Sequence, residues 1–246
     1  MNILGGLGNE WNYDAWMTVV TLVLALGWLL VVNVGVRVYK LPSTLSRKII
    51  HTGTGPLFVL CWPFFSEAVY ARYLAAIVPL GLTLVFFLVG MGWLDNPDLV
   101  RSSTRNGDRT ELLKGPLYYG IAFILCTILF WRTSPVGILA LMMLCGGDGL
   151  ADIVGRRWGK RKLPFSPDKS WVGSLAMFFG SFGFGLGYLL LFNQWGYFQP
   201  ELAVGHMVVV VGAIAFIATL VESLPVKDID NIALTIVVIG LGYWWL

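Results

Sequence analysis

Charged residues are scarce in this chain of 246 residues, where Asp, Glu, Lys and Arg together make up 13% of the sequence. Soluble domains typically carry about 25% charged residues. The hydrophobic fraction is 57% and the mean hydropathy is +0.75. This composition excludes a soluble globular domain and predicts an integral membrane protein.

Histidine and cysteine are also rare, with two and three residues respectively. Cys61, Cys126 and Cys145 fall inside apolar segments, and their spacing matches neither a metal-ligand pattern nor a disulfide framework. We therefore interpret the three thiols as inert core residues.

The N-terminus lacks a basic region and a cleavage-like site before the first apolar run, and it is not rich in Arg and Ser as transit peptides are. We expect a bacterial protein or a mature form. A strong excess of base is missing too, because the net charge is +3 and the basic residues are dispersed among apolar runs. We expect anionic lipid or a phosphate-bearing substrate as the partner, and no nucleic acid.

The chain does contain a series of apolar runs that are each long enough to cross a bilayer, which takes about 20 residues. We read residues 1–246 as one all-α domain, a polytopic membrane bundle of about eight transmembrane helices, with seven as the alternative. A short lead covers residues 1–14, and the spans cover 15–36, 49–66, 70–92, 115–131, 135–155, 172–193, 203–222 and 230–246.

The basic residues alternate between the connections. Connections 37–48, 93–114, 156–171 and 223–229 hold 15 Lys and Arg residues, and the others hold two. The positive-inside rule places the first set in the cytoplasm or stroma and both termini on the opposite side. Four polar motifs share that inner side: RKIIH at 47–51, ELLKG at 111–115, the segment 146–174 and the segment 222–231. A transporter is expected to carry polar groups near the midplane, so this distribution favours a one-sided site.

The segment 146–174 concentrates charge next to an apolar span. Asp148 and Asp152 are four residues apart, and Arg156 follows one turn later, so a continuous helix places all three on one face. Two carboxylates at this spacing can share Mg²⁺, which usually keeps substrate phosphates in its shell. The alternative is an ordinary salt bridge from Asp152 to Arg156. Glycines at 146, 147 and 149 indicate close approach of other groups to Asp148.

Basic residues continue beyond this helix. The cluster Arg156, Arg157, Lys160, Arg161 and Lys162 predicts either phosphate binding or contact with lipid headgroups. Lys169 and Ser170 precede the next apolar span, where a helix N-terminus offers unpaired N–H groups and its positive dipole end to a phosphate.

Two remote segments could complete such a site. Glu222, Asp228, Asp230 and Asn231 place four oxygen-bearing side chains within ten residues. Helix capping is the alternative for any one of them, especially Asp230 or Asn231. His51 lies about a turn inside the second span, where it is either functional or a packing residue, and His206 is read as structural. Together these residue types suit phosphoryl transfer between a soluble nucleotide and a lipid alcohol.

The sequence resembles the polyprenol kinase family, in particular its phytol kinases. The matching motifs are RKIIHTGTG at 47–55, GDGLADIVGRRWG at 147–159, KLPFSPDKSWVGS at 162–174 and VESLPVKDIDN at 221–231. The resemblance implies a multi-pass membrane kinase that phosphorylates an isoprenoid alcohol with CTP or UTP and Mg²⁺, for salvage into tocopherol or phylloquinone synthesis. It also implies location in a cyanobacterial-type plasma or thylakoid membrane or in a plastid membrane, with the site facing the cytoplasm or stroma. The resemblance leaves open whether the protein forms a homodimer.

On this resemblance we assign the site residues. The catalytic candidates are Asp148, Asp152, His51 and Lys169, and the metal ligands are Asp148, Asp152, Asp230 and Glu222. Nucleotide binding is assigned to Arg156, Arg157, Gly159, Lys162, Lys169, Ser170, Gly173, Asp228 and Asn231.

The same region is similar, more distantly, to CDP-diacylglycerol synthases, so a CDP-lipid-forming cytidylyltransferase is the alternative function. Two departures disfavour it: Val172 stands where those enzymes usually have an acid, and the C-terminal motif ends in DIDN without their Gly-His-Gly-Gly and Asp-Arg signature. A small transporter is the third option. The sequence does not identify the alcohol, because the length of its chain is recognised by apolar packing that the sequence does not locate.

Overall fold

The computed structural model describes residues 3–225 and 230–246 and consists of helices apart from one short hairpin. The helices are α1 (Ile3–Tyr39), α2 (Ser43–Leu60), α3 (Ala71–Met91), α4 (Pro97–Ser103), α5 (Gly115–Leu129), α6 (Pro135–Met142), α7 (Asp148–Trp158), α8 (Trp171–Gln194), α9 (Val204–Ser223) and α10 (Asp230–Trp245). Short 3₁₀ helices cover Trp62–Phe64 (η1) and Arg109–Leu113 (η2), and a π-helix covers Met143–Gly147 (η3).

Six helical segments are long and apolar enough to cross a membrane. They cover residues 9–39, 71–91, 109–129, 135–158, 171–194 and 204–223 of the described chain. The two remaining predicted spans fall on α2, which begins with polar residues, and on α10, a shorter apolar helix. The all-α membrane fold is therefore confirmed, whereas the count of eight spans and their orientation stay predictions.

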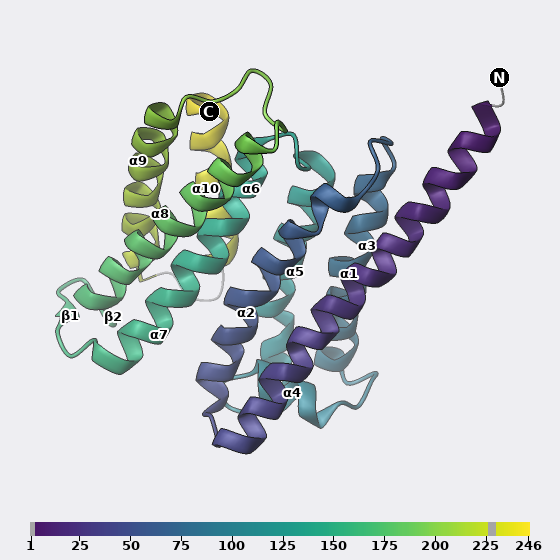
Figure 1. Ribbon diagram of the computed structural model, residues 1–246. Coiled ribbons are helices and arrows are strands. Elements are labelled where there is room, and N and C mark those ends of the chain that lie inside the picture. The colour runs from purple at the N-terminus through teal and green to yellow at the C-terminus, as the bar shows by residue number, and fades with distance from the viewer. Residues whose placement is uncertain (1–2, 226–229) are drawn as a thin grey trace.

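The helices form one bundle in which α1 begins and α10 ends at the same end (Figure 1). Helix α4 and the hairpin lie at the opposite end. Helices α6 and α7 with the intervening π-helix run through the interior, since 83% of their most apolar window is buried, against 17% for α1. The aspartates of α7 are thereby carried on the most enclosed span.

Two segments outside the predicted spans are helical. Residues 3–14 of the predicted lead belong to α1, which begins at Ile3. The connection 37–48 is mostly helical, with a break of only three residues at 40–42, because Pro42 cannot continue the first helix and instead precedes the next. As a consequence Arg47 and Lys48 lie on α2 and are fixed to the bundle.

The basic connection 156–171 is also more ordered than a loop. It contains the end of α7 and an antiparallel hairpin of β1 (Lys162–Leu163) and β2 (Ser166–Ser170). The hairpin leads directly into α8, whose N-cap is Ser170: the Ser170 hydroxyl accepts from the Gly173 N–H at 3.1 Å. The hairpin thus returns the chain to the bundle beside α7.

Candidate active site

The π-helix at Met143–Gly147 places Asp148 at the start of α7. A π-helix has a wider turn than an α-helix, and such turns are frequent at functional sites. Here the Leu144 carbonyl accepts a hydrogen bond from His51 Nε2 at 3.0 Å. The distortion therefore ties the interior span to α2 next to Asp148.

The glycines around Asp148 have the close contacts that the sequence indicates. A Cβ at Gly146 would collide with Phe184, one at Gly147 with Ser181, and one at Gly149 with Thr52. These neighbours lie on α8 and α2. Residues without side chains at these three positions let α7 pack tightly between the two helices.

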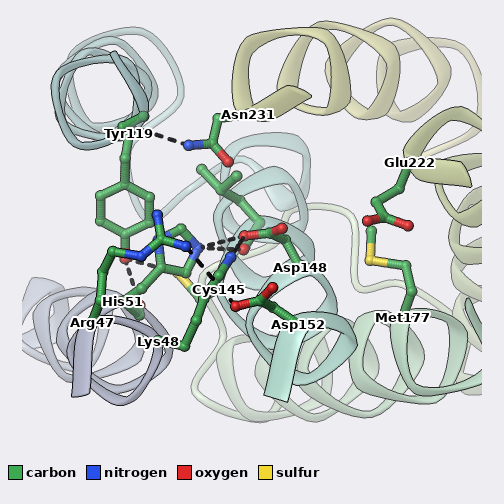
Figure 2. Close-up of polar contacts among 12 residues, drawn as sticks. Arg47, Lys48, His51, Tyr119, Cys145, Asp148, Asp152, Met177, Glu222 and Asn231 are labelled. Atoms are coloured by element: carbon green, nitrogen blue, oxygen red, sulfur yellow. Dashed lines mark hydrogen bonds and ion pairs between the residues drawn. The ribbon is translucent and has the colours of Figure 1, made fainter. Parts of the chain in front are cut away.

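Asp148 is paired with two side chains of α2 (Figure 2). Lys48 Nζ lies 2.6 Å from Asp148 Oδ2, and His51 Nε2 lies 3.2 Å from the same oxygen. Lys48 and Asp148 are both buried, at 6% and 8% exposure. Tyr119 of α5 stacks near His51, with ring centroids 4.1 Å apart, and donates its hydroxyl to the His51 carbonyl at 2.8 Å. Three helices therefore hold one buried carboxylate in place.

Asp152 faces the same space but is only partly paired. Helix α7 continues through both aspartates as predicted, and Arg156 Nε donates to Asp152 Oδ1 at 2.8 Å, so the alternative salt bridge does form. Asp152 Oδ2 is buried without a hydrogen bond, and Arg47 Nη2 lies 3.9 Å from it. Arg47 itself has two buried nitrogens, Nε and Nη2, without hydrogen-bond partners. Buried polar groups are normally satisfied, so these atoms indicate a ligand.

A second group of polar residues lies in the same cavity on β2, α9 and α10. Lys169, the penultimate residue of β2, forms an ion pair with Glu222 of α9. Glu222 Oε2 is buried without a hydrogen bond. Asn231 Nδ2 donates to the Gly115 carbonyl at 3.2 Å, so α10 is joined to α5 at the edge of the site.

One cavity of about 700 Å³ connects these groups. Its polar part, which we call the chamber, is lined mainly by charged residues from several elements. They are Arg47, Lys48, His51, Arg105, Glu111, Lys114, Asp148, Asp152, Arg156, Lys162, Asp168, Lys169, Ser170 and Glu222. Its apolar part, which we call the arm, runs between α1, α2, α3 and α5 and is lined by Ala25, Leu29, Phe58, Val78, Leu82 and Phe123.

Most of the residues that the sequence assigned to the site line this cavity. They are His51, Asp148, Asp152, Arg156, Lys162, Lys169, Ser170, Gly173, Glu222 and Asn231.

Arg157 and Gly159 do not line the cavity. Arg157 is exposed and lies over the Trp158 ring at 5.1 Å, and a Cβ at Gly159 would collide with Ser170, so this glycine packs α7 against the start of α8. Asp228 lies outside the described residues, and of Asp230 only the backbone is described, as the first residue of α10.

The four predicted metal ligands do not gather into one cage. Among residues 3–225 and 230–246, no group of three or more His, Cys, Asp and Glu residues is placed to hold a metal ion. Glu222 instead pairs with Lys169. The donor set that remains is two carboxylates one turn apart, one with an oxygen that has no hydrogen bond, which suits Mg²⁺ bound jointly with phosphates.

Several chamber residues carried no assigned role at the sequence level. Lys48 and Arg47 stand in the RKIIH motif, and Lys114 and Glu111 in ELLKG, but nothing in those motifs shows that they face Asp148. Arg105 lies between α4 and η2, and its charge acts on Arg47. The one available signal was the clustering of these motifs on a single predicted face.

Comparison with known proteins places this cavity in a family context. The model of the cytidylyltransferase family matches residues 11–229. Curated relatives include phytol kinase 1, chloroplastic, of Arabidopsis thaliana, which is 42% identical over 82% of this chain and 66% of its own length. A probable phytol kinase 1 of Glycine max is 41% identical over 83% of this chain and 68% of its own length.

A further relative is the chloroplastic farnesol kinase of Arabidopsis thaliana, 41% identical over 76% of this chain and 60% of its own length. The chain thus spans just under two thirds of the Arabidopsis phytol kinase. No solved structure matches.

Proposed function

The chain belongs to the cytidylyltransferase family, and on that premise we propose that it is a membrane kinase that transfers the terminal phosphoryl group of CTP to an isoprenoid alcohol, with phytol as the first candidate. The observation that carries this proposal is the single cavity in which a charged chamber continues into an apolar arm. A nucleotide triphosphate fits the first part by charge, and an isoprenoid chain fits the second by its lack of polarity.

The relatives support this choice within the family. The two most relevant names, phytol kinase and farnesol kinase, both describe phosphorylation of an isoprenoid alcohol. The family name describes cytidylyl transfer, which also uses CTP. A CTP donor is therefore consistent with both, and the acceptor and the phosphorus attacked distinguish them.

The chamber offers cations on two opposite sides of Asp148. Arg47 and Lys48 come from α2, whereas Lys169 comes from the hairpin and lies next to the N-terminus of α8. Lys and Arg neutralise phosphate charge, and helix N-termini add backbone N–H donors. We assign the triphosphate to the space between these two sides.

Asp148 and Asp152 would hold Mg²⁺ together with the phosphates, and the orphaned Asp152 Oδ2 is the observation that supports this fit. When bound, Mg²⁺ would neutralise charge on the transferring phosphoryl group.

In the proposed reaction the alcohol oxygen forms a bond to the γ-phosphorus, and the bond from that phosphorus to the bridging β,γ-oxygen breaks. CDP leaves with the electron pair of the broken bond, and the hydroxyl proton passes to the carboxylate of Asp148. Such a transfer needs mainly positioning and charge neutralisation. The buried, three-helix setting of Asp148 supplies the positioning.

His51 acts in this scheme as a positioning residue. Its Nε2 contacts both the Leu144 carbonyl and Asp148 Oδ2, and a carbonyl oxygen can only accept, so Nε2 carries hydrogen and donates. This nitrogen therefore orients Asp148 and is not the base. The carboxylate is left as the group that takes the proton.

The test is product analysis with purified protein in phytol-containing vesicles. A kinase converts CTP and phytol into CDP and phytyl monophosphate, whereas a cytidylyltransferase releases pyrophosphate and forms a CDP-lipid. CTP labelled separately at the α- and γ-phosphates distinguishes the two by following each label into lipid. Label from the α-position in lipid would reject the kinase assignment in favour of the family's named chemistry.

The donor and the acceptor are identified by a matrix of CTP, UTP, ATP and GTP against phytol, geranylgeraniol and farnesol, with products identified by mass. We expect CTP to be the best donor. Uptake of a solute into vesicles without nucleotide consumption would instead support a transporter.

A further inference from the structure

The arm ends in a floor formed by two aromatic rings. Phe58 of α2 and Phe123 of α5 lie with ring centroids 5.9 Å apart, at 4% and 3% exposure. Phe58 also contacts Trp62 edge-to-face at 6.0 Å, and Trp62 is fully buried against Trp131 at 5.2 Å. The floor is therefore backed by a packed aromatic cluster.

The depth of the arm follows from the spacing of lining residues along its helices. On α2, His51 marks the chamber and Phe58 the floor, and these seven residues span about 10 Å at 1.5 Å per residue. On α3 the lining residues descend from Phe86 through Leu82 to Val78, which gives a depth of about 12 Å. The arm thus extends from the reacting groups into the apolar bundle, and because extended phytol is longer than this depth, its chain must fold within the arm.

Among the residues that the structure describes, the walls of the arm offer hydrocarbon and no free polar group. Thr54 and Thr83 line it, but each donates its hydroxyl to the carbonyl four residues earlier, Ile50 and Pro79 respectively, at 2.8 Å and 2.6 Å. The Tyr119 hydroxyl is likewise used on the His51 carbonyl. A polar ligand would lose its hydration here without replacement, so the arm suits an apolar chain.

We infer that the arm holds the isoprenoid chain of the acceptor, with its hydroxyl at Asp148, and that the floor of Phe58 and Phe123 sets the chain length that fits. This inference rests on the proposed kinase function and names its acceptor subsite. An isoprenoid alcohol is already dissolved in the bilayer, where lipid tails are as apolar as the arm. Transfer of the chain from the bilayer to the arm therefore does not discriminate between chain lengths. Steric fit against a stiff floor can discriminate between them.

Two substitutions with opposite effects test this inference. Phe58→Leu replaces a ring of the floor by a smaller side chain and so deepens the arm. The longest alcohol that the variant uses efficiently should be longer than that of the wild type. Leu82→Phe narrows the arm about one turn above Val78 and should move it to a shorter length. The matched control is Phe179→Leu, because Phe179 is 65% exposed on α8 and does not line the cavity.

The measurement is CTP-dependent phosphorylation of geraniol, farnesol, geranylgeraniol, phytol and a longer polyprenol at equal fractions in vesicles. We expect the efficiency ratio of long to short alcohols to rise about tenfold in Phe58→Leu and to fall about tenfold in Leu82→Phe, as for a misfit of one group in an apolar pocket. A general loss of stability would lower all rates without opposite changes in this ratio.

Profiles of all three variants that superimpose on the wild-type profile would overturn the inference while leaving the kinase function intact. Absence of phosphorylation for every alcohol in the wild-type protein would instead reject the proposed function.

Discussion

Two buried charge clusters lie at opposite ends of α2, and they differ in how fully their atoms are paired. The Asp148 cluster, with Arg47, Lys48, His51 and Asp152, lies near the start of the helix. The Arg132 cluster, with Glu67 and the carbonyls of residues 62, 65 and 66, lies beyond the end of the helix, around η1. Both contain charges that a membrane protein normally avoids burying.

The buried charged groups of the Arg132 cluster are paired. Arg132 is 1% exposed and donates to the carbonyls of Trp62, Phe65 and Ser66 at 2.7–2.8 Å. Its guanidinium also pairs with Glu67 at 2.8 Å. Nearby, the fully buried Asp14 accepts from the Ser66 N–H and hydroxyl at 2.7 and 2.6 Å.

In the Asp148 cluster, by contrast, Asp152 and Arg47 retain buried atoms without hydrogen bonds. A buried charged group whose hydrogen bonds are all made within the protein supports the fold. A buried charged group in a cavity that lacks hydrogen bonds indicates a ligand-binding site. The comparison predicts that changes in the Asp148 cluster affect activity and that changes in the Arg132 cluster affect stability.

Asp148→Asn should break the proposed function most completely. The substitution keeps the shape and an acceptor for Lys48 but removes the negative charge and the proton acceptor, so turnover should fall on the order of 10³-fold or more. Initial rates of CDP formation measure the loss, and thermal unfolding in detergent checks the fold. The matched control is Asp98→Asn, whose carboxylate pairs with Arg37 at 3.3 Å and is 75% exposed. Near-wild-type turnover in Asp148→Asn would reject the assignment.

Arg132→Met should produce the opposite result. Methionine fills a similar length but leaves three carbonyls without their donor, so the free energy of unfolding should fall by about 3 kcal/mol or more. The melting temperature in detergent measures this loss. At low temperature, catalytic efficiency per folded molecule should stay within about twofold of the wild type, since the site is remote. A stable but inactive protein would contradict the division between the clusters.

The same comparison explains what the sequence predicted and what it missed. Asp148, Asp152 and Arg156 were placed on one face correctly, because their spacing equals the helical repeat and α7 continues through all three. The neighbouring glycines were also read correctly as points of close approach. Both inferences depend on local geometry, which spacing along the chain determines.

The sequence pattern does not predict which residues tertiary packing brings together. Arg47 and Lys48 were placed in a connection, and only the short break at 40–42 puts them on a helix that faces Asp148. The arm is lined by four helices, and no single segment encodes its floor at Phe58 and Phe123. Arg132 is one of the two basic residues outside the four basic connections, and nothing in the sequence shows that the loop after α2 buries it.

Arg47→Met sharpens the comparison most directly, because it makes the same substitution as in the Arg132 cluster. Burial and the like charge of Arg105 disfavour the Arg47 cation, whose Nε and Nη2 have no hydrogen bond and whose contact with the Asp152 carboxylate is 3.9 Å long. Its removal should therefore leave the melting temperature unchanged or raise it. The KM for CTP should rise about 10- to 100-fold, because charged hydrogen bonds to phosphate are lost. Arg47→Lys should recover part of that affinity. A drop in stability as large as in Arg132→Met would show that Arg47 is structural.

The smallest effects should separate two cations of the basic connection. Lys162 lines the cavity, whereas Arg157 is exposed over Trp158 and does not. Both side chains are exposed, so solvent screens their charges and each contributes at most about 1 kcal/mol. Lys162→Gln should raise the KM for CTP about two- to fivefold at low salt, and the difference should shrink as ionic strength rises. Arg157→Gln should leave the KM unchanged under all conditions. Equal effects of the two substitutions would mean that the whole connection acts as a diffuse basic surface, and the nucleotide site would then have to include the exposed end of α7.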